Sequence, residues 1–118
     1  MNLISRTLTA LLLITMQAAP AIRAQQPDRT IEIHAHRFSF EPSEITLKQD
    51  EVVQLRLVSD DVTHALLVPG LNINQEIKKG KPTDIIVKPT TAGDFRGQCG
   101  RFCGGGHGSM LFVVHVKE

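Results

Sequence analysis

Apolar and polar residues alternate through most of the chain after residue 30, with the period of two that is typical of half-buried strands. The alternation is clearest in Val53-Gln54-Leu55-Arg56-Leu57, where three apolar side chains share one face. Turn residues interrupt it at short intervals, and no segment after residue 30 has a convincing helical period. We predict residues 72–82 to be one long loop. The predicted strands cover residues 31–40, 45–47, 53–57, 65–68, 85–87, 95–99 and 111–116.

About seven or eight short strands separated by turns, within about 90 residues, favour an all-β fold, a Greek-key β-sandwich or barrel. The chain has no Trp or Tyr, so its core has to consist of Val, Ile and Leu together with five Phe side chains. A length of 118 residues leaves room for one domain. We expect that domain over residues 30–118, after a short flexible N-terminus over residues 25–29.

The first 24 residues have the pattern of a secretory signal peptide. Arg6 gives a positive start, residues 8–16 form an apolar run, and Ile22-Arg23-Ala24 resembles a cleavage site. We predict cleavage after Ala24, and therefore an exported, periplasmic or otherwise extracytoplasmic protein. The apolar run is shorter than the ~20 residues that a membrane span needs, so no span is expected after cleavage. Removing residues 1–24 leaves 11 basic and 12 acidic residues, a net charge of −1, which implies no nucleic-acid partner.

One glycine-rich segment, residues 99–110, contains both cysteines of the chain together with a histidine and a methionine. Thiolate, imidazole and thioether are soft ligands that select copper or zinc over magnesium or calcium. The glycines give the backbone freedom to fold tightly around an ion. A second histidine has to come from elsewhere, and His64 is the best candidate because it follows a turn and precedes an apolar run. The candidate ligands in the segment are Cys99, Cys103, His107 and Met110.

Several interpretations of these residues are open at this point. Export favours a disulfide between Cys99 and Cys103, but so short a loop gains little stability and leaves His107 and Met110 unexplained. A redox-active cysteine pair is another possibility, although the chain lacks the alternating strands and helices of a thioredoxin-like fold. Zinc would accept both cysteines and both histidines without needing Met110. A mononuclear blue-copper site would use His64, Cys103, His107 and Met110, and would leave Cys99 idle.

The spacing of these residues resembles a known family. Val62-Thr63-His64 is followed, after 34 residues, by Cys99-x3-Cys103-x3-His107-x2-Met110. This pattern resembles the signature of the binuclear CuA copper centre in cytochrome c oxidase subunit II. The flanking residues Asp61-Val62-Thr63-His64 and Gly97-Gln98-Cys99 are also similar to that family, and Phe38-Ser39-Phe40-Glu41-Pro42 is similar to cupredoxins generally. The resemblance covers nearly the whole predicted domain and implies a fold of the cupredoxin type.

The resemblance implies a cofactor of two copper ions that share one unpaired electron, which keeps geometric change small and electron transfer fast. The residue between the cysteines is usually glutamate in the family, but it contributes through its main chain. Arg101 at this position would therefore keep the ligand and alter the local charge. The implied metal ligands are the bridging thiolates of Cys99 and Cys103, the capping imidazoles of His64 and His107, the axial thioether of Met110, and the backbone carbonyl of Arg101.

Two features differ from the family. Its two membrane helices have no counterpart here, and its tryptophan-rich segment corresponds to residues 36–40, which contain no tryptophan. We therefore expect a free-standing exported domain that transfers single electrons and is not an enzyme by itself. Its expected partner is an unidentified redox protein such as a cytochrome or an oxidase component. A mononuclear blue-copper carrier and a copper chaperone for oxidase assembly are the alternatives.

Two groups of residues outside the segment could also bind a metal or a partner. His34 and His36 lie two residues apart on a predicted strand, so they share a face and can bind a metal as a pair, although such residues are more often solvated. Lys78, Lys79 and Lys81 form a basic patch that can meet an acidic partner, although a charged turn usually faces water.

Overall fold

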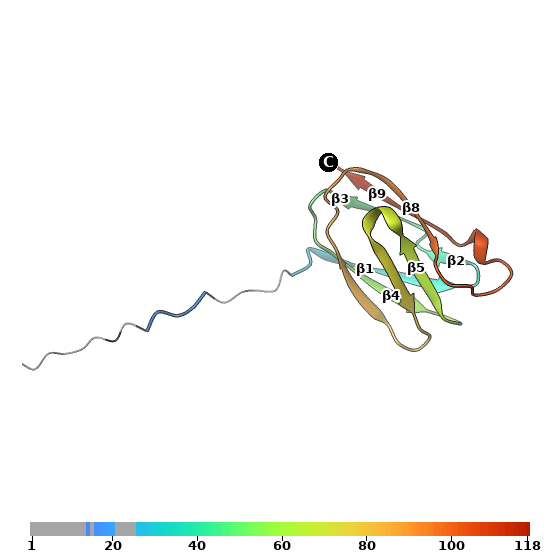
Figure 1. Cartoon of the computed structure of the whole chain (residues 1–118), viewed down its shortest axis with the longest axis horizontal. Coiled ribbons are helices and arrows are strands. Elements are labelled where there is room, and N and C mark those ends of the chain that lie inside the picture. The colour runs from blue at the N-terminus through green and yellow to red at the C-terminus, as the bar shows by residue number, and fades with distance from the viewer. Residues whose placement is uncertain (1–13, 15, 21–25) are drawn as a thin grey trace, which may run out of the picture.

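Two β-sheets form a sandwich in the computed structural model, which describes residues 14, 16–20 and 26–118 (Figure 1). The described residues contain nine strands. The first sheet has the strand order β2-β1-β4-β7, and the second has the order β3-β9-β8-β5-β6. The strands of the first sheet are β1 (Arg29–His36), β2 (Ser39–Glu41), β4 (Val53–Ser59) and β7 (Thr83–Val87). Those of the second are β3 (Glu44–Lys48), β5 (His64–Val68), β6 (Ile73–Ile77), β8 (Gly93–Cys99) and β9 (Leu111–Lys117).

The chain crosses between the two sheets several times. These crossings place β1 parallel to β4 and β3 parallel to β9, whereas the other neighbouring strands are antiparallel. Short 3-10 turns follow β5 (Pro69–Leu71) and precede β9 (His107–Ser109). The all-β Greek-key sandwich predicted from the alternating pattern is therefore confirmed, with nine strands instead of seven or eight.

The two additional strands have different origins. The predicted strand over residues 31–40 is a hairpin of β1 and β2, in which His36 pairs with Ser39. The predicted loop over residues 72–82 is wrong in its first half, because residues 73–77 form β6 and pair with β5. Ile73 and Ile77 are buried, but the inward position between them is the polar, half-buried Gln75. A polar residue at that position hides the alternation that otherwise identifies a strand.

The core lies between the sheets and consists of apolar side chains on alternating positions. In β4 every second residue is buried, as the sequence pattern predicts. Phe40 of β2 and Phe112 of β9 meet across the two sheets with ring centroids 5.7 Å apart in an edge-to-face arrangement. Both rings are almost completely buried, so this pair joins the sheets close to the end where β9 begins.

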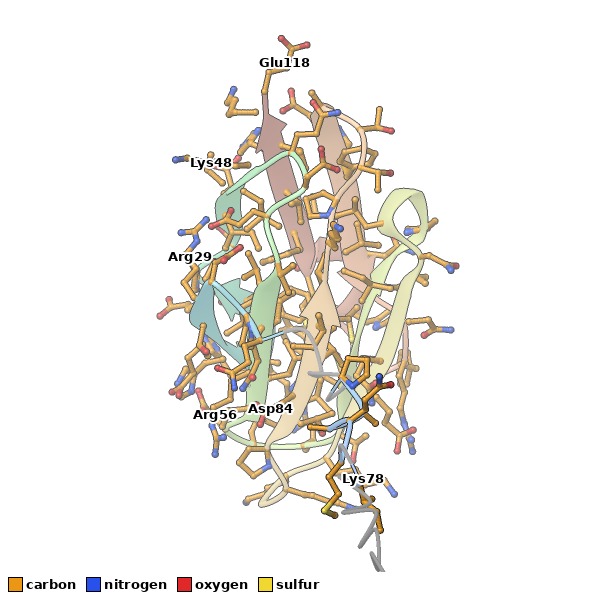
Figure 2. The ribbon with its side chains drawn as sticks, turned by 90° about the vertical axis from the view of Figure 1, so that its left-hand side faces the viewer. Arg29, Lys48, Arg56, Lys78, Asp84 and Glu118 are labelled. Atoms are coloured by element: carbon orange, nitrogen blue, oxygen red, sulfur yellow. The ribbon has the colours of Figure 1, made fainter. Side chains whose placement is uncertain are left out.

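The candidate ligands lie at one end of the sandwich. β5 begins with His64, β8 ends with Cys99, and the segment from Cys99 to Met110, which we call the cysteine loop, leads into β9. Figure 2 shows Lys48 and Glu118 toward one end of the molecule and Lys78 toward the other. Lys78 follows β6, whose last residue pairs with His64, so it belongs to the end that carries the cysteine loop.

The predicted signal peptide lies largely outside the described residues, and its cleavage site after Ala24 lies wholly outside them. The boundaries at residues 24 and 29 stay predictions. β1 begins at Arg29, whose guanidinium donates a hydrogen bond to the Glu51 carboxylate at 2.7 Å. In the part of the chain that the structure describes, no helix has the length and apolar character needed to span a membrane.

Candidate metal centre

The neighbouring strands β5 and β8 bring His64 and Cys99 together. Leu66 of β5 pairs with Cys99 at the end of β8, and the N–H of Gly100 donates to the carbonyl of Ala65 at 3.0 Å. The N–H of Cys99 donates to the carbonyl of Met110 at 3.1 Å. This bond closes the cysteine loop at its base, so the two ends of the loop are held side by side above the sheet.

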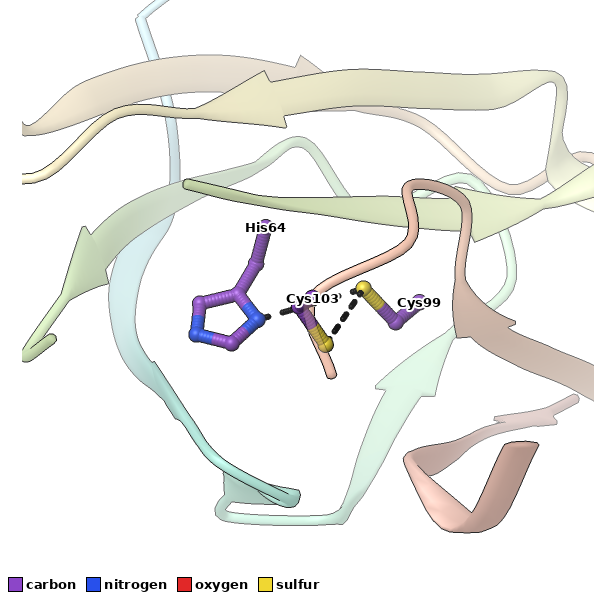
Figure 3. A group of neighbouring side chains, drawn as sticks. All are labelled: His64, Cys99 and Cys103. Carbon is purple, nitrogen blue, oxygen red and sulfur yellow. Dashed lines mark hydrogen bonds between the residues drawn. The ribbon is translucent and has the colours of Figure 1, made fainter. Parts of the chain in front are cut away.

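Three ligand atoms form a compact group (Figure 3). The Sγ of Cys99 lies 3.9 Å from the Sγ of Cys103 and 3.9 Å from the Nδ1 of His64. All three atoms lie within 4.8 Å of one another, and all three residues are buried. Both cysteines are free thiols.

The other three predicted ligands extend this group on both sides. The Nδ1 of His107 lies 3.8 Å from the Sγ of Cys103, and the Sδ of Met110 lies 3.4 Å from the same sulfur. The carbonyl oxygen of Arg101 lies 3.1 Å from the Sγ of Cys99. Each thiol therefore has one imidazole nitrogen and one weaker donor beside it. The structure brings together all six residues that the sequence singled out.

Four of the six residues of the group are shielded from water, and the exceptions are His107 and Arg101. His64 and Met110 are completely buried, and the cysteines are nearly so. His107 is half-buried, and its ring centroid lies 5.9 Å from that of Phe102, whose side chain is 76% exposed. Burial, together with the neighbouring Cys99 thiol, raises the pKa of the Cys103 thiol to about 11. Without a cation, Cys103 therefore keeps its proton at neutral pH.

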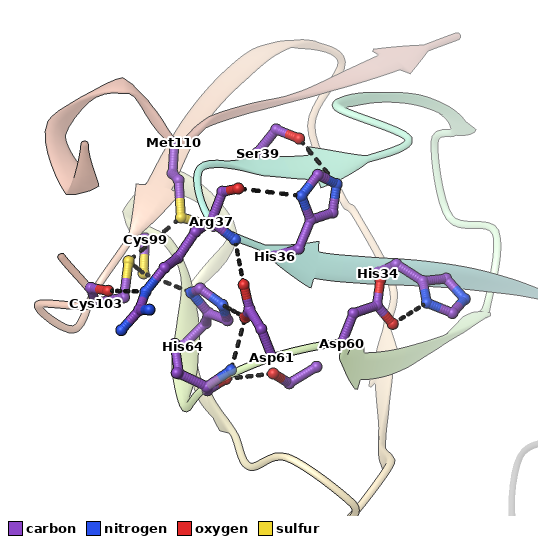
Figure 4. A network of polar contacts seen from close by, with 12 residues as sticks. His34, His36, Arg37, Ser39, Asp60, Asp61, His64, Cys99, Cys103 and Met110 are labelled. Carbon is purple, nitrogen blue, oxygen red and sulfur yellow. Dashed lines mark hydrogen bonds and ion pairs between the residues drawn. The ribbon is translucent and has the colours of Figure 1, made fainter. Parts of the chain in front are cut away.

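Asp61 fixes the ring of His64 (Figure 4). The Nε2 of His64 lies 2.6 Å from Oδ1 of Asp61, which leaves Nδ1 to face the Cys99 sulfur. The same carboxylate accepts the backbone N–H groups of Arg37 at 2.7 Å and Val62 at 2.6 Å. Partial burial raises the pKa of Asp61, but the hydrogen bonds from Arg37, His64 and Val62 outweigh it and hold the pKa at about 2. A carboxylate that orients a ligating histidine in this way is common at metal sites.

The turn between β1 and β2 supports the cysteine loop from the other side. The Nε of Arg37 donates to the carbonyl of Cys103 at 2.8 Å. The ring of Phe38 lies against Gly104 and Gly106, where an added Cβ would overlap with ring atoms. Gly104 also has a φ of 143°, which favours glycine. Contact with the Phe38 ring is therefore a second reason, besides backbone freedom, for glycine in this loop.

Asp61, Arg37 and Phe38 were not predicted from the sequence to belong to the site. A signal for Asp61 was present, since it precedes His64 by three residues and directly follows a strand and turn. Arg37 and Phe38 carried no such signal, because their contacts depend on the cross-sheet arrangement of the β1–β2 turn.

His34 and His36 do not join the centre. His34 lies between the carboxylates of Glu32 at 2.6 Å and Asp60 at 2.8 Å, and hydrogen bonds to Asp60 and Glu32 raise its pKa. The ring of His36 contacts the Ser39 hydroxyl at 3.2 Å. In the described residues, neither histidine belongs to a group of three close metal-ligating side chains.

Two thiols, two imidazoles, a thioether and a carbonyl form a soft to borderline donor set, which fits copper or zinc and not a hard cation. The donors lie close together, most of them are buried, and a hydrogen bond to Asp61 already orients His64. This arrangement is therefore a candidate site that could hold a soft metal ion.

Replacing Asp61 by asparagine should weaken metal binding, because the amide nitrogen cannot accept the hydrogen bonds that now fix the carboxylate and His64. We expect copper affinity, measured by competition with a chelator, to fall about 10- to 100-fold. Asp60→Asn is the matched control, since Asp60 contacts His34 and lies outside the centre. Equal affinities for the two variants would show that Asp61 does not orient His64.

Comparisons with known proteins find a matching family model and several similar chains. A family model described as a cupredoxin-like domain matches residues 7–111. Cytochrome c oxidase subunit 2 of Thermus thermophilus is 32% identical over 89 residues, which cover 75% of this chain and 66% of that protein. The match therefore spans slightly less than two thirds of the relative's length.

Two solved structures show the same fold. The periplasmic domain of subunit II of cytochrome oxidase from Bradyrhizobium japonicum superposes with a TM-score of 0.73 at 19% identity, covering 81% of this chain and 88% of that domain. Auracyanin A, a blue copper protein from Chloroflexus aurantiacus, superposes with a TM-score of 0.62 at 13% identity, covering 75% and 98%. At these identities the similarity shows a shared fold only.

Proposed function

This chain belongs to the family of cupredoxin-like domains, and from that premise we propose that it is an exported electron-transfer protein with a binuclear CuA-type copper centre. The main support is the arrangement of two thiol sulfurs 3.9 Å apart, with one imidazole nitrogen beside each. The similarity to a cytochrome c oxidase subunit 2 supports the same assignment.

In this proposal each candidate ligand has a defined role. Cys99 and Cys103 would hold the copper through their thiolates, and His64 and His107 would supply the imidazole ligands. Met110, next to the Cys103 sulfur, and the carbonyl of Arg101, next to the Cys99 sulfur, are the weaker ligands. Bound copper would supply the one-electron oxidation and reduction.

The protein around the site keeps these ligands in place. The buried positions exclude water, Asp61 holds the His64 ring, and the half-buried His107 is where the site comes closest to solvent. A site whose ligands are held rigidly changes little between oxidation states, which favours fast electron transfer.

A mononuclear blue-copper site is the second candidate, and the fold shared with auracyanin A favours it. It would use His64, Cys103, His107 and Met110. The arrangement supports it less well, because it leaves Cys99 idle although that thiol belongs to the group of three donors that lie within 4.8 Å of one another. A zinc site of two cysteines and two histidines leaves Met110, 3.4 Å from Cys103, without a role.

We propose a redox protein as partner, a cytochrome or an oxidase component, and an extracytoplasmic location. The location is supported by the predicted signal peptide and by the shared fold with a periplasmic domain. The buried ligand set favours a carrier that retains its metal over a chaperone that hands it on. In this role the chain exchanges electrons with its partner and is not an enzyme by itself.

Copper binding should depend on pH through Cys103. Because its thiol pKa is raised to about 11, binding at neutral pH has to release this proton. We therefore expect copper affinity to rise by about tenfold per pH unit for this proton, up to the thiol pKa. Competition titrations at several pH values measure the slope, and an affinity independent of pH would contradict a thiolate ligand at this position.

A redox titration that counts electrons and copper together tests the proposed function. A binuclear carrier takes up one electron for every two coppers, reversibly, and keeps its copper when a Cu(I) chelator is added. One electron per copper would indicate the blue-copper alternative. Transfer of copper to the chelator on reduction would indicate a chaperone, and a site that cannot be reduced would indicate zinc.

A further inference from the structure

Exposed basic side chains surround the end of the molecule that carries the cysteine loop. We call Arg37, Lys78, Lys79, Lys81 and Arg101 the basic rim; all five are exposed. The three lysines lie in the turn between β6 and β7, which a bridge between Lys78 and Lys81 closes. Lys79 pairs with Ser59, the last residue of β4, which places this turn beside the segment leading to His64.

One carboxylate connects the lysine turn to the cysteine loop. The Oε2 of Glu76 lies 2.7 Å from Nη1 of Arg101, and its Oε1 lies 3.7 Å from Nζ of Lys78. Glu76 therefore compensates two cations with a single charge. Among the described residues, Arg37, Lys79 and Lys81 have no carboxylate within ion-pair distance. The rim is thus one continuous surface with an excess of positive charge.

Other acidic side chains at this end are already engaged. The carboxylate of Asp61 accepts hydrogen bonds from His64 and from backbone amides, and Asp60 contacts His34. Asp84 of β7 lies 3.5 Å from Arg56 of the neighbouring strand β4, and Figure 2 labels both. Asp60 and Asp61 remain negatively charged, so together with Glu76 they offset three of the five basic charges and leave a local excess of two, although the whole chain has a net charge of only +1.

The rim encloses an apolar contact point next to the candidate metal centre. Arg37 and Arg101 line a shallow surface depression of about 370 Å³, which Phe102 and Cys103 also line. Phe102 is 76% exposed and touches the ring of His107. An exposed aromatic ring surrounded by charge, with arginines beside it, is typical of protein interfaces.

We propose that the basic rim and Phe102 form the docking surface for the redox partner, and that this partner presents an acidic face. The proposal rests on the proposed function, because it uses His107 as the ligand nearest to the partner. Opposite charges would steer the partner toward this end and orient it. The surface of the partner would then lie against the Phe102 ring, which contacts His107. A lipid headgroup layer would match the charge, but it would not fill the depression beside Phe102.

The first test needs no copper. Poly-L-glutamate is titrated into the metal-free, isotope-labelled chain, and NMR shifts locate its contacts. We expect shifts at the amides of Arg37, Arg101, Phe102 and the lysine turn, and their loss at high salt. The triple variant Lys78→Glu, Lys79→Glu, Lys81→Glu should bind at least about tenfold more weakly.

A charge-matched control separates the rim from net charge. Lys48, Lys88 and Lys117 are exposed lysines at the opposite end, where Lys48 pairs with Lys117. Their triple change to glutamate alters the net charge equally and should leave the shifts at the rim in place. If both triple variants weakened poly-L-glutamate binding equally, the proposal would be overturned. NMR shifts that lie outside the rim would also overturn it. Rim-dependent binding to phosphatidylglycerol vesicles that exceeds binding to poly-L-glutamate would also overturn it, in favour of a membrane surface.

The second test uses the copper-loaded chain and two small oxidants. Anionic hexacyanoferrate(III) should oxidise the reduced chain faster at low salt than at high salt, and cationic hexaammineruthenium(III) should show the opposite dependence. The rim variant should reverse both salt dependences, and the control variant should leave them unchanged. If copper does not bind at all, the proposed function fails, but the metal-free titration still decides whether the rim binds acidic chains.

Discussion

Replacing Cys99 by serine should reduce the copper content from two ions per chain to one. The change removes the thiol beside His64 and the Arg101 carbonyl, but it leaves Cys103 with His107 and Met110. Together with His64, these residues are the ligand set of a blue-copper site. We therefore expect a single copper with a different spectrum, measured by metal analysis and electron paramagnetic resonance.

Cys103→Ser is the matched comparison, and its expected result is different. Cys103 is the sulfur that contacts Cys99, His107 and Met110, so its loss leaves no complete set for either ion. This variant should retain no tightly bound copper. Two coppers in the Cys99→Ser variant would refute a shared pair of thiolates. An equal copper content in the two variants would show that the two sulfurs do not differ in their role.

Replacing Phe112 by alanine should destabilise the metal-free chain by about 3–5 kcal/mol, since a buried phenyl ring is lost and a cavity remains. Phe112 is completely buried and packs edge to face on Phe40 from the opposite sheet. Domains are commonly stable by only about 5–15 kcal/mol, so this loss is a large part of the total. Urea denaturation with a chelator present measures it without a contribution from bound metal.

Leu111→Ala is the control on the same strand. Leu111 is 56% exposed and precedes Phe112 directly, so its truncation should change the free energy of unfolding by less than about 0.5 kcal/mol. Similar losses for the two variants would mean that Phe112 does not occupy the core as the structure has it.

Much of the fold was predictable because alternation reports directly on which face of a strand is buried. The prediction was correct for β4, where every inward position is apolar, and wrong for β6, where Gln75 interrupts the inward face. Strand pairing was not predictable in the same way. Nothing local in the sequence indicates that Leu66 pairs with Cys99, and that pairing brings His64 to the cysteine loop.

The ligand residues could be found because five of the six lie in one short segment with a distinctive spacing. The groups that support them could not, since they come together only through the fold. Arg37 contacts the carbonyl of Cys103 across 66 residues of sequence, and Arg101 reaches Glu76 on a strand that was predicted to be a loop. The connection of the lysine turn to the metal end likewise depends on Glu76.

Copper analysis combined with electron paramagnetic resonance of the copper-loaded chain tests the central claim most directly. We predict two coppers per chain and a hyperfine pattern from one unpaired electron shared by two copper nuclei. One copper per chain, with the pattern of a single copper nucleus, would contradict the binuclear centre and assign the chain to the blue-copper alternative.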